Sequence, residues 1–102
     1  MVLLEFSIIP LGKGASVSAY VARSLEIIDR SGLDYRLHAM GTIIEGDLPE
    51  VLDVLRECME AISADCDRVT CTAKLDYRKG HRDRLQTKVQ SVEEKVGRAL
   101  KK

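Results

Sequence analysis

The sequence has 102 residues, 45% of them hydrophobic and 31% charged, and its 16 basic residues balance its 16 acidic ones. This composition is typical of one globular domain, residues 1–102, and not of a disordered chain. The zero net charge argues against strong electrostatic binding to nucleic acid or anionic lipid. No apolar run approaches the roughly 20 residues of a membrane helix. Neither nucleic acid nor a membrane is therefore expected as a partner.

Residues 2–10 alternate in a way that predicts a strand. Val2, Leu4 and Phe6 share one face, and the residues between them point the other way. The segment lacks the basic region and the cleavage site of a secretory signal peptide. Pro10 and the two glycines at positions 12 and 14 end the strand.

A helix is predicted over residues 16–31. The hydroxyl of Ser16 is suited to cap the first helical turn, and Gly32 stands where a left-handed residue commonly ends a helix. Between them, Tyr20, Leu25 and Ile28 follow helical spacing.

Two short strands are predicted between Tyr35 and Gly46, with Gly41 as a turn or bulge between them. A second helix then begins at Asp47, where Asp caps and Glu50 completes a capping box. Its expected buried stripe consists of Leu48, Val51, Leu55, Cys58 and Ile62, widened by Leu52 and Met59.

The last strand is predicted over residues 68–76 and is expected to be half-buried, because Val69, Cys71 and Leu75 alternate with polar residues. Gly80 breaks the chain after it. A third helix follows, with a narrow apolar stripe from Leu85 to Leu100.

This order of elements predicts an α+β fold, a ferredoxin-like βαββαβ sandwich with an extra C-terminal helix. Right-handed crossovers place both long helices on one sheet face. The other face mixes Leu3, Ile9 and Met40 with charged and polar residues. Such a face suits association with another copy of the chain, so a homo-oligomer is expected, with a ligand at the seam near Met40 and Glu45.

No catalytic signature is present. The sequence has no glycine-rich nucleotide fingerprint, phosphate-binding loop, nucleophile elbow or zinc-protease motif, so we expect a protein that is not an enzyme and uses no cofactor or metal. The three cysteines form no C-x-x-C pair and predict neither a disulfide framework nor a thiolate site; a cytoplasmic location follows as an expectation.

Three polar features leave alternatives open. Glu45 either meets a polar ligand group or caps a turn. Lys74, Asp76 and Arg78 lie two apart and form a solvated face, an ion-pair network between subunits, or a ligand contact. The basic turn from Arg78 to Arg84 opens a helix and is a candidate anion site, which leaves open an enzyme that acts on small phosphorylated metabolites.

Three stretches in order carry a family resemblance: residues 7–12 with 16–21, residues 40–46, and residues 74–78. They resemble the YkoF-like thiamine-binding protein family. The resemblance implies a ferredoxin-like homo-oligomer, a dimer or tetramer, that binds or carries thiamine or its hydroxymethylpyrimidine part without catalysis. The positions that it marks as ligand-binding are Ser16, Ser18, Tyr20, Met40, Thr42, Glu45, Lys74 and Arg78.

Aminopyrimidine chemistry gives several of these positions a role, with Ser18 or Thr42 serving the ring nitrogens. Tyr20 or Met40 offers a surface for a flat ring, and Glu45 can accept from the amino group. Lys74 and Arg78 suit a phosphorylated form or a subunit interface rather than the thiazolium cation. The alternative function is a regulatory or protein-interaction module that uses the open sheet face.

Overall fold

A computed structural model describes residues 1–12, 14 and 17–102. Along the chain the elements are β1 (Val2–Pro10), α1 (Ser18–Ser31), β2 (Asp34–His38), β3 (Gly41–Gly46), α2 (Leu48–Ser63), β4 (Val69–Tyr77) and α3 (Arg84–Val96). The predicted α+β fold, βαββαβ with an added C-terminal helix, is confirmed.

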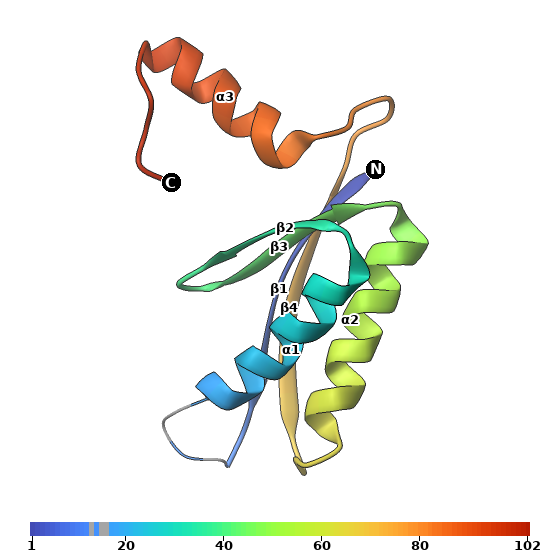
Figure 1. Ribbon diagram of the computed structural model, residues 1–102. Helices are drawn as coiled ribbons and strands as arrows, with labels where there is room; N and C mark the ends of the chain where they lie inside the picture. Colours follow the sequence, from blue (N-terminus) through green and yellow to red (C-terminus); the bar gives the residue numbers. More distant parts are fainter. Residues whose placement is uncertain (13, 15–16) are drawn as a thin grey trace.

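The four strands form one antiparallel sheet in the order β2-β3-β1-β4. Helices α1 and α2 lie side by side on one face, and α3 follows β4 beyond the upper end of the sheet in Figure 1, where it contacts β2 and β3. Over the described parts of the chain, none of the helices is both long and apolar enough to cross a membrane.

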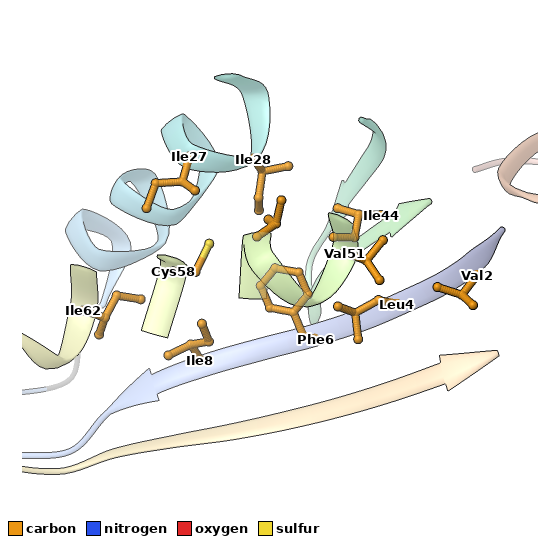
Figure 2. Close-up of a cluster of buried hydrophobic side chains, with 11 residues drawn as sticks. Val2, Leu4, Phe6, Ile8, Ile27, Ile28, Ile44, Val51, Cys58 and Ile62 are labelled. Carbon is orange, nitrogen blue, oxygen red and sulfur yellow. The ribbon is translucent and has the colours of Figure 1, made fainter. Parts of the chain in front are cut away.

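The hydrophobic core lies between β1 and the helix pair. The even-numbered residues of β1 point toward the helices, and Leu4 and Phe6 meet Ile28 of α1 and Val51 of α2 there (Figure 2). Burying each such side chain contributes roughly 1.5–3 kcal/mol to folding. The alternation predicted for residues 2–10 is therefore what joins the sheet to its helices.

Helix α1 begins two residues later than predicted. Val17 occupies the position before the first helical residue, Ser18, and Gly32 ends the helix with φ of 77°, as predicted. The proposed capping role of Ser16 lies outside the described residues.

The turn between β2 and β3 differs from the prediction. His38 pairs with Gly41, so Ala39 and Met40 form a two-residue hairpin turn and Gly41 is the first residue of β3 rather than a turn or bulge. A side chain at Gly41 would put its Cβ 2.9 Å from the Phe6 carbonyl oxygen. The glycine is thus needed for close strand approach and not for turn conformation.

Helix α2 begins as predicted, with the capping box between Asp47 and Glu50. Its buried stripe is shifted by part of a turn, because Val54 is buried whereas Leu48 and Leu52 are exposed. The expectation that these two leucines are buried is wrong.

Strand β4 is largely exposed, and the prediction that it is half-buried is wrong. Its register with β1 places Leu75 beside Leu4 and Tyr77 beside Val2, so both face the helix side. They nevertheless stay 49% and 66% exposed, because α2 packs over β1 and β3 and the edge strand extends past its cover.

The three cysteines have different environments. Cys58 is buried in the core, and burial raises the pKa of its thiol to about 11. Cys66 is half-buried, and Cys71 lies exposed on β4.

Candidate functional site

The carboxylate of Glu45 holds the N-terminus of α3. Glu45 is only 4% exposed, and its Oε2 accepts a hydrogen bond from the backbone N–H of Arg84 at 2.9 Å. Its Oε1 accepts from the N–H of Leu85 at 3.4 Å. The first amides of a helix lack partners within the helix, and a carboxylate there also complements the helix dipole. Of the two alternatives for Glu45, the structure shows a capping role, on a helix that begins 39 residues later.

A second polar bridge ties α3 to β4. Asp76 Oδ2 accepts from Arg84 Nη2 at 2.5 Å and from Lys88 Nζ at 2.9 Å. The Arg84 side chain is almost fully buried, and its Nη1 also donates to the Asp76 carbonyl oxygen at 3.2 Å. Hydrogen bonds from Lys88 and Arg84 lower the pKa of Asp76 below its ordinary value.

Between these bridges and the β2–β3 hairpin, α3 and the sheet enclose a groove of about 820 Å³. Leu3 and Ile43 line it from the sheet, and Leu85 and Val89 line it from α3. A smaller recess of about 130 Å³ adjoins it and adds Glu5 and Lys74. The volume falls in the range of small-molecule sites, and two apolar walls are suited to a flat ring.

Polar groups stand at the sides of this groove. His38 Nδ1 accepts from the N–H of Met40 at 3.2 Å, so its Nε2 carries the proton and lies 3.5 Å from Glu5 Oε2. Glu93 Oε2 accepts from Lys102 Nζ at 2.7 Å and from the Leu100 N–H at 2.6 Å, and these hydrogen bonds lower its pKa. Donors and acceptors therefore converge on an apolar slot.

The predicted ligand-binding residues do not share one surface. Thr42 is paired with Phe6 and is buried on the helix side of the sheet, whereas Glu45 is paired with Leu3 on the α3 side. Residues an odd number apart on one strand point to opposite faces, so one bound ligand within a single subunit cannot meet both side chains.

Ser18 and Tyr20 lie with Thr42 on the helix side, in the first turn of α1. The Tyr20 ring is already covered by the guanidinium of Arg23, 5.1 Å from the ring centre, and Arg23 is held by Asp65 at 2.8 Å. Ser16 lies outside the described residues. Met40, at the hairpin tip, is 84% exposed.

Lys74 and Arg78 lie on the α3 side or at its end. Lys74 is paired with Glu5 on the open part of that face and lines the small recess. Arg78 follows the last residue of β4, so it is not part of a three-residue ladder with Lys74 and Asp76. Asp76 pairs within the chain with Arg84 and Lys88, and an ion-pair network between subunits stays a prediction.

The residues that form the groove were not among those predicted. Val89, Gln90 and Arg36 lie on elements that the sequence pattern located correctly. The sequence pattern that could have predicted the groove is the apolar stripe of the last helix together with Leu3 and Ile43 on the second sheet face. Matching these two stripes to each other would have indicated the groove.

Comparison with known proteins places this architecture among relatives. Residues 4–93 match the family model described as thiamine-binding protein. The UPF0045 protein MJ1052 of Methanocaldococcus jannaschii is 42% identical over 93 residues, which cover 91% of this chain and 93% of that protein. A UPF0045 protein of Mycobacterium bovis is 40% identical over 93 residues, covering 90% of this chain and 91% of its own length.

Solved structures agree with the fold. The crystal structure of MJ1052 superposes with a TM-score of 0.85, covering 91% of this chain and 96% of that one. A candidate thiamine biosynthesis/salvage protein from Thermotoga maritima superposes with a TM-score of 0.72 at 22% identity, covering 94% and 95% of the two chains. At that identity the second comparison shows the fold alone.

Proposed function

The chain belongs to the thiamine-binding protein family, and from that premise we propose that it binds thiamine or its hydroxymethylpyrimidine part in the groove under α3. Family membership indicates a thiamine-related role. The proposal adds the ligand, a carrier role without catalysis, and the site. The observation that carries it is the pair of apolar walls with polar groups at their sides.

The chemistry of the ligand fits these walls. An aminopyrimidine is a flat ring with an amino donor and ring-nitrogen acceptors, and Leu3, Ile43 and Val89 offer apolar contact to its two faces. Gln86 and Gln90 supply both donors and acceptors along α3. In the adjoining recess the carboxylates of Glu5 and Asp76 attract a thiazolium cation, while Lys74 and Lys88 on its wall oppose it.

A matched pair of substitutions on α3 tests the site. Both Val89 and Val92, one turn further on, are exposed, but only Val89 lines the groove. By calorimetry, Val89→Lys is expected to raise the dissociation constants of thiamine and hydroxymethylpyrimidine at least roughly tenfold, and Val92→Lys is expected to leave them within about twofold. Equal effects of the two variants, or no binding by the wild type at millimolar ligand, would remove the groove from consideration.

The predicted homo-oligomer also remains a proposal, and the structure supplies a surface for it. Strand β4 pairs with β1 along one edge, and no strand of the described residues pairs with its other edge. Leu75 and Tyr77 form an exposed apolar strip beside that free edge. An unpaired edge of this length is a template for antiparallel pairing with a second copy.

Charge favours one register for such pairing. If Leu75 of two copies meet at a twofold axis, Lys74 lies opposite Asp76 of the partner subunit, and the same pair recurs across the axis. The expected assembly is then a dimer with a continuous eight-stranded sheet, and its further pairing gives a tetramer.

The molar mass of the protein, measured by light scattering after size-exclusion chromatography, tests this interface. Leu75→Lys brings like charges together at the axis and is expected to yield monomers. The matched control is Leu37→Lys, which changes an exposed leucine on β2, the opposite edge strand, and should leave the mass unchanged. A monomeric wild type, or a stable complex with a different protein at β4, would favour the interaction-module alternative.

A further inference from the structure

A second cavity lies at the junction between β4 and α3, separate from the groove but sharing a wall with it. It encloses about 380 Å³ and is lined by Arg78 and His81 from the connecting loop and by Arg84, Thr87, Lys88 and Ser91 from α3. These four helical residues stand at positions i, i+3, i+4 and i+7, so one face of α3 forms the wall.

The charge of this cavity is positive. Arg78, Arg84 and Lys88 carry three cationic groups, and among the described residues only the carboxylate of Asp76 pairs with any of them, at 2.5 Å from Arg84 and 2.9 Å from Lys88. Glu45 is close by, but its carboxylate accepts from the backbone amides of Arg84 and Leu85. The helix amides are therefore occupied, and an incoming anion would meet side chains.

Three groups of the cavity are available to a ligand. Within the part of the chain that the structure describes, the Arg78 guanidinium makes no ion pair or hydrogen bond, and neither do the hydroxyls of Thr87 and Ser91. A guanidinium presents paired N–H donors that match the oxygens of a phosphate, and hydroxyls add further donors.

We propose that this cavity, the Arg78 pocket, binds a phosphate or diphosphate group. Arg84 and Lys88 line both the Arg78 pocket and the groove. A ligand whose ring lies in the groove can thus extend its phosphate into the pocket. The ligand class is then a phosphorylated form of the groove's ligand, such as a thiamine phosphate, and this last step rests on the proposed function.

Calorimetry with thiamine, thiamine diphosphate and inorganic pyrophosphate tests the pocket on the full chain. Thiamine diphosphate is expected to bind at least roughly tenfold more tightly than thiamine, with an advantage that shrinks as salt is added. Arg78→Gln should abolish this advantage and keep thiamine affinity within about twofold. The matched control is Arg82→Gln, in the same loop but outside the pocket lining, which should keep the advantage.

The outcomes separate this inference from the proposed function. If thiamine and its diphosphate bind equally, or if both arginine variants lose the same affinity, the Arg78 pocket is overturned while the groove stands. If thiamine fails to bind but pyrophosphate binds in an Arg78-dependent manner, the pocket stands and the groove falls. If neither diphosphate compound binds, the pocket is overturned whatever thiamine does.

Discussion

The two faces of the sheet are closed in different ways. On one face α1 and α2 pack aliphatic side chains against β1 and β3, with Leu4, Ile28 and Ile44 fully buried. On the other face α3 is held mainly by two carboxylates. Glu45 accepts hydrogen bonds from the first backbone amides of the helix, and Asp76 pairs with the side chains of Arg84 and Lys88. The first arrangement packs side chains closely around a core, whereas the second leaves a groove between α3 and the sheet. The helix-covered face therefore holds the core of the fold, and the α3 face holds the groove proposed as the ligand site.

The strongest test of this contrast uses two adjacent isoleucines of β3. Ile44 points into the core and is fully buried, while Ile43 points toward α3 and is half-buried. Ile44→Ala is expected to lower the free energy of unfolding by about 2–5 kcal/mol, and Ile43→Ala by about 1 kcal/mol, in urea unfolding followed by circular dichroism at one protein concentration. Equal losses would show that both faces are packed cores.

The second largest loss of stability is expected when the Glu45 cap on α3 is removed. Glu45→Ala leaves the N–H groups of Arg84 and Leu85 without their acceptor, and it is expected to cost about 1–2 kcal/mol. Amide hydrogen exchange should speed up in α3 and stay slow in α1 and α2. Glu45→Gln keeps an acceptor oxygen and should lose less; loss of protection throughout the protein would contradict the division between the two faces.

Lowering the pH tests the difference between the two faces without a mutation. The pKa values of Asp76 and Glu93 lie below their ordinary values of 3.8 and 4.5, because cationic side chains donate hydrogen bonds to both. A carboxyl with a depressed folded pKa adds stability above its unfolded value, and that stability is lost as the pH falls through the folded value. Exchange protection of α3 is therefore expected to decline below about pH 4 while the core helices remain protected. Asp76→Asn should reduce this pH dependence, and an unchanged profile would count against the bridge.

The smallest effect is expected for an ion pair on an exposed surface. Arg56 donates to Glu60 at 3.1 Å along the outward side of α2, where both side chains are mostly exposed. Arg56→Gln preserves helix propensity and is expected to change the free energy of unfolding by at most about 0.5 kcal/mol. A loss as large as that of Glu45→Ala would show that burial is not what makes the α3 bridge effective.

Local patterns predicted the fold well. The period-2 alternation of β1, the capping box at Asp47 and the left-handed Gly32 depend on neighbours within a few residues, and all three are confirmed. The exposure of Leu75 depends instead on how far α2 reaches across the sheet, which no local pattern of β4 contains. The burial of Val54 in place of Leu52 has the same origin.

The site was harder to predict for a related reason. Glu45 stands beside a glycine at a strand end, where a ligand contact and a cap look alike, and its partners lie 39 and 40 residues away. Thr42 and Glu45 belong to one motif in sequence but to opposite faces in space. Thr42 and Glu45 are three positions apart on one strand, so their side chains point to opposite faces. Counting positions along the strand was enough to separate them, and an assignment by motif alone does not do this.

The bridge from Glu45 to α3 has a consequence for the time course of folding. The strands β1 and β3 must already be paired, and β4 must be in place, before Glu45 and Asp76 stand where α3 can dock on them. Stabilisation by α3 should therefore arise after the rate-limiting assembly of the sheet, so weakening the bridge is expected to speed unfolding and to leave the refolding rate almost unchanged. Helix α3, which covers the groove, would be the last element to dock during folding and the first to detach during unfolding.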